Sequence, residues 1–238
     1  MPDVLVLCYH ALSERWPAAL STTPGRFEEQ LELLLRRGYT PVTFEQALTD
    51  PPAPRALAVT FDDAYRSVLE LAQPIMERLG VPGTVFAPTD WVGRTEPMTW
   101  DGIDQWLGGP HEHELLCLGW PELRELADGG WEVGSHTRSH PRLTTVDDKR
   151  LGAELRDSRA ACEEGMGRPC RSIAYPYGDV DARVIAAARA AGYELAAALP
   201  KRHGSTDRLD WPRVGVYHRD DLRRFRLKAS PLLRRLRS

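Results

Sequence analysis

Short apolar runs alternate with longer amphipathic stretches along most of the chain. The runs are short and end near turn residues, which is typical of buried strands. They cover residues 4–8, 56–61, 83–87, 131–134, 172–175, 193–198 and 213–217. The stretches between them place apolar residues at helical spacing, between Thr23 and Gly38 and at residues 66–78, 120–128, 147–164 and 181–191. Strands separated by crossover helices predict βαβ units, in either an α/β barrel or an open doubly wound sheet.

Local signals mark some of the helix boundaries. Thr23 and Pro24 suit the N-cap and the first position of a helix, and Gly38 suits its end. Pro74 lies inside the apolar pattern of residues 66–78, so we expect a kink there before the helix ends near Gly80.

Two segments depart from this alternation. Residues 88–119 contain three tryptophans but little periodicity, which predicts an insertion that forms a lid or binding surface, or a loop with a small aromatic core. Residues 219–238 interleave Arg and Lys with Leu and Phe. Such a basic amphipathic tail can lie on an anionic membrane surface, or pack as a terminal helix on the body. We therefore predict one domain over residues 1–218, followed by this tail.

Composition and charge narrow the class of protein. The chain has 238 residues, with 31 Lys and Arg against 34 Asp and Glu, so no basic field predicts a nucleic-acid partner. The four cysteines form no C-x-x-C pair, which favours reduced structural thiols. No signal peptide is visible, and no apolar stretch approaches the roughly 18 residues of a spanning helix. We expect a cytoplasmic location, with peripheral membrane contact through the tail as the alternative.

Two acidic residues follow one of the predicted strands. Asp62 and Asp63 lie in Thr60-Phe61-Asp62-Asp63-Ala64, at the carboxyl end of residues 56–61. Parallel α/β folds build their sites at this end of the strands. Neighbouring carboxylates repel each other unless a cation or a proton lies between them. If the backbone stays extended, the two side chains point in opposite directions and serve different roles. A simple helix N-cap is the alternative.

Two histidines follow another short strand. His136 and His140 come directly after residues 131–134, and their side chains converge if the segment makes one helical turn. With Asp63 they supply two imidazoles and one carboxylate, which leaves open positions for water and a substrate oxygen, as in catalytic zinc sites. Water in such a site is acidified and attacks a carbonyl near neutral pH. Ordinary loop histidines are the alternative.

Together with a third segment, these motifs resemble the polysaccharide deacetylase family, the NodB-like domain of carbohydrate esterase family four. The family motif T-F-D-D-G corresponds to residues 60–64, H-[ST]-x-x-H to residues 136–140, and a Y-P-Y-G variant of R-x-P-Y to residues 174–178. Three motifs in the same order are far more specific than any one alone. The resemblance implies a distorted (β/α) barrel of about seven units.

The resemblance also implies a role for each matching residue. Asp62 is the base that deprotonates the attacking water. Asp63, His136 and His140 hold a divalent metal, with zinc expected first and cobalt, nickel or iron as alternatives. The backbone N–H of Tyr177 stabilises the oxyanion that forms during attack.

The chain departs from the family pattern at several positions. Ala64 replaces the usual glycine, and Ala174 stands where the family has the arginine that orients the base. Arg213 is our candidate for that arginine, and a plain surface residue is the alternative. The late Leu-x-His motif that carries the general acid is absent. His10, at the end of the first strand as in circularly permuted relatives, is our candidate for the acid, and His218 is its competitor.

With these residues, the resemblance implies a metal-dependent hydrolase that removes N-acetyl groups from hexosamine units. Its partner would be an acetylated glycan: a polysaccharide such as an exopolysaccharide, an oligosaccharide or a lipid-linked sugar. Deformylation, O-acetyl ester hydrolysis and small-amide hydrolysis share this site chemistry and stay open. A catalytically inactive glycan-binding relative is a third hypothesis, which the intact base and ligand set disfavours.

Overall fold

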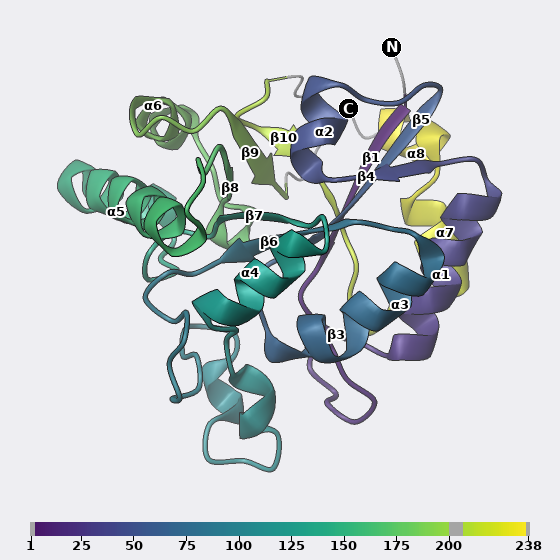
Figure 1. Cartoon of the computed structure of the whole chain (residues 1–238), viewed down its shortest axis with the longest axis horizontal. Coiled ribbons are helices and arrows are strands. Elements are labelled where there is room, and N and C mark those ends of the chain that lie inside the picture. The colour runs from purple at the N-terminus through teal and green to yellow at the C-terminus, as the bar shows by residue number, and fades with distance from the viewer. Residues whose placement is uncertain (1–2, 200–206, 237–238) are drawn as a thin grey trace.

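A sheet of parallel strands forms the centre of the molecule in the computed structural model, which describes residues 3–199 and 207–236 (Figure 1). Hydrogen-bonded neighbours follow the order β9-β8-β7-β6-β5-β1, and β4 pairs with β5. The strands are β1 (Asp3–Tyr9), β4 (Thr40–Val42), β5 (Arg55–Phe61), β6 (Gly83–Ala87), β7 (Glu132–Ser135), β8 (Ser172–Ala174) and β9 (Leu195–Ala198). Most of their apolar side chains are buried, as expected for a parallel sheet covered on both faces.

One short segment joins the two edges of this sheet. Its first part, β10 (Trp211–Pro212), pairs with β9, and its second part, β11 (Val214–Gly215), pairs with β1. Arg213 lies between the two parts. The sheet is therefore nearly closed, which confirms the predicted distorted barrel and decides against the open sheet.

Helices surround the barrel much as the apolar spacing predicts. α5 (Asp148–Met166) and α6 (Ala182–Ala190) lie together on one side, α4 (Trp120–Asp128) lies in front, and α1 (Pro24–Arg36) and α3 (Gln73–Leu79) lie on the other side (Figure 1). Thr23 caps α1 by accepting a hydrogen bond from the Arg26 N–H. Residues 66–78 do not form one regular helix: a π-helical stretch, Val68–Ala72, passes directly into α3, and Pro74 lies in the first turn of α3.

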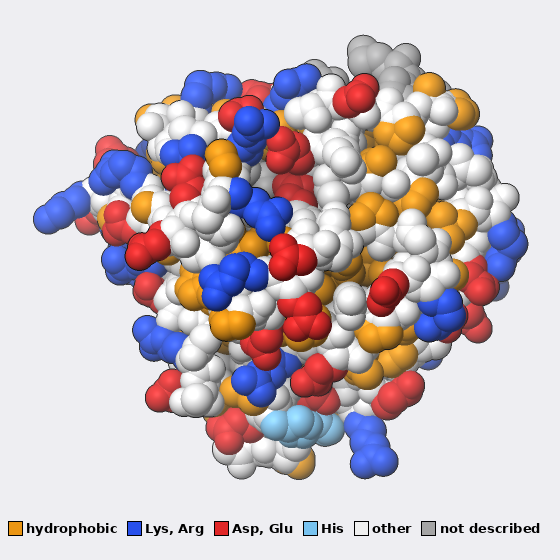
Figure 2. Space-filling view, viewed as in Figure 1, with side chains coloured by type: hydrophobic (Ala, Val, Ile, Leu, Met, Phe, Trp, Pro, Cys, Tyr) orange, Lys and Arg blue, Asp and Glu red, His pale blue; other side chains and the backbone are white. Residues whose placement is uncertain are grey.

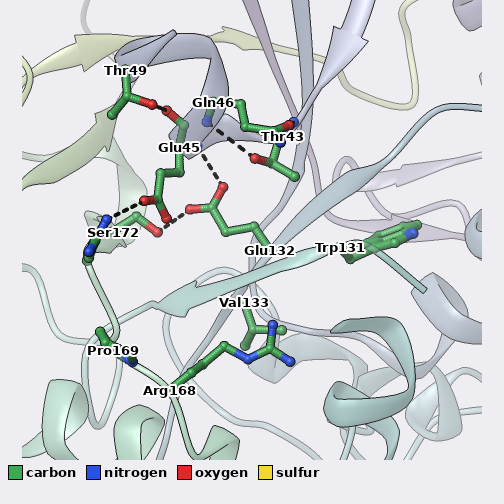
Figure 3. A pocket seen from close by; sticks show the side chains of 11 residues that line it. Thr43, Glu45, Gln46, Thr49, Trp131, Glu132, Val133, Arg168, Pro169 and Ser172 are labelled. Atoms are coloured by element: carbon green, nitrogen blue, oxygen red, sulfur yellow. Dashed lines mark hydrogen bonds and ion pairs between the residues drawn. The ribbon is translucent and has the colours of Figure 1, made fainter. Parts of the chain in front are cut away.

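The amino end of the barrel is closed by α2 (Phe44–Thr49), a helix that the sequence pattern did not predict. Its apolar residues pack against the barrel interior, in a cluster with Val6, Ala58, Phe86, Ala174, Leu195 and Ala197. A pocket of about 320 Å³ lies beside α2 (Figure 3). There the Glu132 carboxylate accepts hydrogen bonds from the Glu45 N–H at 2.7 Å and the Ser172 hydroxyl at 2.5 Å (Figure 3). These contacts fix α2 at the end opposite to the strand termini that carry the motifs.

The C-terminal tail packs on the body as two short helices, α7 (Leu222–Lys228) and α8 (Pro231–Leu236). Phe225 is buried, and Arg234 pairs with Asp3 at 2.6 Å, which ties α8 to the start of β1. Leu227 and Leu232 remain 55% and 67% exposed. The packing agrees with the terminal-helix alternative, whereas membrane contact and the division at residue 218 stay predictions. No helix in the described part of the chain is both long and apolar enough to cross a membrane.

The surface carries both signs of charge. Over α5 and α6, Lys and Arg side chains are interspersed with Asp and Glu (Figure 2). No large field of one sign covers that face, in keeping with a formal net charge of −3.

Candidate active site

The predicted site residues converge at the carboxyl ends of neighbouring strands. Loops after β1, β5, β7 and β8 contribute to one pocket of about 400 Å³. Its polar lining includes His10, Asp62, Asp63, His136, His140, Tyr177, Arg142 and Tyr217, and Trp100 adds an aromatic wall. Segments far apart in the sequence thus meet in one place, as the strand-end argument predicts.

Asp63, His136 and His140 place three donor atoms around a common point. The Asp63 Oδ1 atom lies 3.3 Å from the Nε2 atom of each histidine, and the three ligand atoms lie within 4.8 Å of one another. All three residues are buried. Despite burial, the two histidines hold the pKa of Asp63 well below its ordinary range.

The hydrogen bonding of His136 indicates that this cluster needs a positive charge at its centre. Its Nδ1 atom lies 2.8 Å from the Ala174 carbonyl oxygen, so Nδ1 carries the proton. In the neutral ring, Nε2 then directs a lone pair toward the Asp63 carboxylate. A buried lone pair facing a buried anion is unfavourable unless a cation or a proton lies between them. The donor set, two imidazoles and one carboxylate, fits a divalent transition metal such as zinc.

Unusual backbone conformations bring these side chains together. Five non-glycine residues have positive φ angles: Asp63 (69°), Ala64 (49°), Thr137 (65°), His140 (61°) and Tyr177 (60°). The acidic pair does not keep the extended backbone that would point its side chains in opposite directions, because the chain turns at Asp63 and both carboxylates face the pocket. The two histidines converge without the helical turn that was the stated condition, since this loop is irregular.

Asp62 forms a buried ion pair with Arg213. The guanidinium donates to both carboxylate oxygens, at 2.6 Å and 2.8 Å, and Nη1 also donates to Thr60 Oγ1 at 3.0 Å. Asp62 is 2% exposed and Arg213 is 1% exposed, so Arg213 is not the plain surface residue that was the alternative. Burial raises the pKa of Asp62, but Arg213, together with His136 and His10, outweighs burial and lowers that pKa to about 2. The carboxylate stays ionised and fixed in direction.

His10 lies at the end of β1, next to Asp62. Burial lowers its pKa from the ordinary value, and its Nδ1 atom has no hydrogen-bond partner among the residues that the structure describes. His218 lies outside this pocket and lines a neighbouring one of about 450 Å³, with Pro17, Ala19, Tyr217 and Arg219. The structure therefore brings His10, but not His218, to the pocket that holds the acidic pair.

The third motif forms a tight turn at the rim of the pocket. Tyr177 has a left-handed backbone, and the guanidinium of Arg142 lies 3.9 Å from the centroid of its ring. Gly178 also has a positive φ of 66°, and a Cβ atom there would lie 2.3 Å from Leu199 Cβ. The glycine is thus required by both conformation and space.

Three contributors to the site were not singled out from the sequence. Trp100 and Arg142 line the pocket, and the Cys8 thiol lies 3.4 Å from Asp62 Oδ2. Cys8 was expected only to be a buried thiol, and burial raises the pKa of that thiol well above its ordinary value. The tryptophan content of residues 88–119 was the one available signal for Trp100.

Comparison with known proteins agrees with this geometry. The family model described as polysaccharide deacetylase matches residues 49–196. The chain is 25% identical over 195 residues to YxkH of Bacillus subtilis (strain 168), a polysaccharide deacetylase by name, covering 80% of this chain. It spans 62% of the length of that relative. It is also 22% identical over 209 residues to a poly-beta-1,6-N-acetyl-D-glucosamine N-deacetylase of Staphylococcus aureus (strain MSSA476), with 82% of this chain and 67% of the relative covered.

Solved structures share the fold. A polysaccharide deacetylase from Bacillus cereus superimposes with a TM-score of 0.75 at 25% identity, covering 96% of this chain and 69% of the other. The Streptococcus pyogenes deacetylase PplD, solved with acetate, gives a TM-score of 0.78 at 21% identity, over 97% and 100% of the two chains. The family match extends over more than half of the sequence and includes the acidic pair and both histidines. The chain therefore belongs to the polysaccharide deacetylase family.

Proposed function

We propose that the protein is a divalent-metal-dependent hydrolase that removes N-acetyl groups from hexosamine units of a glycan. The observation that carries this proposal is the Asp63–His136–His140 cluster, whose ligand atoms lie within 4.8 Å of one another beside Asp62 in an open pocket. The Staphylococcus aureus relative that acts on poly-beta-1,6-N-acetyl-D-glucosamine supports an N-acetylglucosamine polymer as the first substrate to test.

Each residue of the pocket has its own role in the proposed hydrolysis. A divalent metal held by Asp63, His136 and His140 would supply Lewis acidity toward water and the amide carbonyl. Asp62, ionised and aimed by Arg213, accepts the proton of the attacking water. The backbone N–H of Tyr177 donates to the carbonyl oxygen as negative charge develops there. His10 gives a proton to the departing amine, so that acetate and a free amino sugar leave.

Metal dependence is tested by acetate release from β-1,6-linked N-acetylglucosamine oligomers. We expect a chelator to abolish release, and added zinc, cobalt or nickel to restore it. Asp62→Asn serves as the matched variant, because it should bind metal and yet release little acetate. Acetate release that a chelator leaves unchanged would contradict the metal mechanism.

The proton donor is tested with two substrates of different leaving group. We expect His10→Asn to lose most hydrolysis of the amide, whose amine leaves only when protonated, and to retain hydrolysis of an aryl acetate ester, whose phenolate leaves readily. His218→Asn is the control and should resemble the wild type on both. Loss of amide hydrolysis in His218→Asn together with normal turnover in His10→Asn would reverse the assignment.

A further inference from the structure

The insertion over residues 88–119 begins on the loop that carries the two histidines. The Thr89 N–H donates to the Thr137 carbonyl at 3.1 Å, and the Asp90 N–H donates to the Arg138 carbonyl at 2.9 Å. The Asp90 carboxylate also lies 3.3 Å from the Arg138 guanidinium. The first residues of the insertion thus pair with the backbone between His136 and His140.

The end of the insertion pairs with the loop that carries the acidic residues. The Leu118 N–H donates to the Ala64 carbonyl at 2.9 Å, and the Arg66 N–H donates to the Leu116 carbonyl at 3.0 Å. An antiparallel bridge between Tyr65 and Cys117 lies between these two hydrogen bonds. Both loops of the candidate metal site are therefore tied to one segment.

The middle of the insertion reaches the site directly. The ring of Trp100 stacks on the ring of His140, with centroids 4.0 Å apart and planes 17° from parallel. Trp91 packs edge-on against Trp100 at 5.9 Å. The carbonyl of Asp101 accepts a hydrogen bond from the Tyr177 hydroxyl at 3.1 Å. These contacts fix Trp100 over the imidazole.

The two histidines differ in how their rings are held. A metal-binding histidine ordinarily donates its other ring N–H to an oxygen, which sets the orientation of the ring. His136 has such a contact, from Nδ1 to the Ala174 carbonyl at 2.8 Å. The Nδ1 atom of His140 is buried and has no hydrogen-bond partner in the part of the chain that the structure describes.

We propose that Trp100 is a positioning residue for His140, and that its stacked ring orients the imidazole in place of a hydrogen bond to Nδ1. This inference rests on the proposed metal-dependent function. The stack fixes the plane of the ring, so that Nε2 points toward Asp63. The electron-rich face of the indole also favours the partial positive charge that an imidazole carries when it binds a metal.

The test measures metal affinity apart from catalysis, by competition of the apo-protein with a chromophoric chelator for zinc and cobalt. We expect Trp100→Leu, which keeps an apolar contact without an aromatic face, to weaken binding by roughly 10–100-fold. Trp100→Phe should stay within about threefold of the wild type, because it keeps the stack. The visible absorption spectrum of the cobalt-loaded protein should change in Trp100→Leu and not in Trp100→Phe.

Trp106→Leu is the matched control. Trp106 belongs to the same insertion, packs edge-on against Trp16 at 5.8 Å and does not line the active-site pocket. We expect it to bind metal as the wild type does, even if its unfolding temperature falls. Unchanged affinity in Trp100→Leu, or an equal loss in Trp106→Leu, overturns the role of Trp100. Wild-type protein that binds neither metal would instead overturn the proposed function.

Discussion

The buried pair of Asp62 and Arg213 makes a quantitative prediction about stability. Arg213→Met removes the guanidinium and leaves a carboxylate that is 2% exposed without its partner. Breaking a buried ion pair in this way costs about 3–5 kcal/mol. Asp62→Leu/Arg213→Met replaces both charges by apolar side chains of similar volume, and such replacements are often close to neutral. We therefore expect the double variant to be more stable than Arg213→Met by at least about 2 kcal/mol.

The pH dependence of unfolding tests the same ion pair, because the pKa of Asp62 differs between the folded and the unfolded state. In the wild type the folded-state pKa of Asp62 is about 2, below the ordinary value of 3.8. This difference contributes about 2 kcal/mol of stability, present above pH 4 and lost as pH falls toward 2. In Arg213→Met the guanidinium no longer lowers the pKa of Asp62, so burial, opposed by His136 and His10 without Arg213, raises that pKa relative to the wild type. The stability that Arg213→Met loses relative to the wild type should therefore shrink as pH is lowered from 7 toward 5.

The assay is urea unfolding of the chelator-treated proteins, followed by circular dichroism and by tryptophan fluorescence. Coincident transitions would justify a two-state free energy of unfolding for each variant. A loss below about 1 kcal/mol in Arg213→Met would refute the reasoning, as would a double variant no more stable than the single one. Arg213→Lys should fall between wild type and Arg213→Met, because an ammonium cannot donate to both carboxylate oxygens in the same planar geometry.

Other substitutions test the remaining parts of the site. Gly178→Ala should lower the free energy of unfolding by more than about 2 kcal/mol, because its Cβ would overlap Leu199 at a positive φ. Gly80→Ala is the control, with a φ of 66° but nothing within 4 Å of the new Cβ, and should cost about 1–2 kcal/mol in the same urea titration. Asp63→Ala and His136→Ala should each purify with less than a tenth of the metal that the wild type binds, as measured by inductively coupled plasma mass spectrometry. A metal content equal to that of the wild type would argue against their role as ligands.

The sequence predicted the βαβ units because its strands are apolar runs separated by helices, a pattern set by burial, whereas the choice of a barrel over an open sheet came from the family resemblance. It did not predict α2, which has six residues and too little length to show a helical period. The segment that joins the two edges of the sheet was also only partly predicted. Residues 213–217 were expected to be a strand, whereas Trp211–Gly215 pairs with two different strands in pieces of two residues. Such short pairings depend on the position of both edges, which no local pattern records.

The site residues were predictable where the chemistry requires a particular residue type at a particular spacing. Asp63 and the two histidines were found in this way, and Arg213 was found as a replacement for an absent arginine. The stacking of Trp100 on His140 was not predictable, since it depends on where a non-periodic segment lies in space. The Ala174 carbonyl, which orients His136, was not predicted, because every residue has a carbonyl and the sequence does not mark which one accepts this hydrogen bond.

The residues with a left-handed backbone explain why the insertion is part of the site rather than only a neighbour of it. A left-handed backbone costs a non-glycine residue about 1–2 kcal/mol, so the five such residues of the site together oppose folding by several kcal/mol. Strain of this size persists only where the surrounding structure determines the conformation. Ala64 and Thr137 are two of the five, and both accept hydrogen bonds from the insertion through their carbonyls. The segment without periodicity thus stabilises the conformations that turn Asp63 and His140 toward each other, together with Glu154 of α5, whose carboxylate accepts hydrogen bonds from the Arg138 and Ser139 N–H groups.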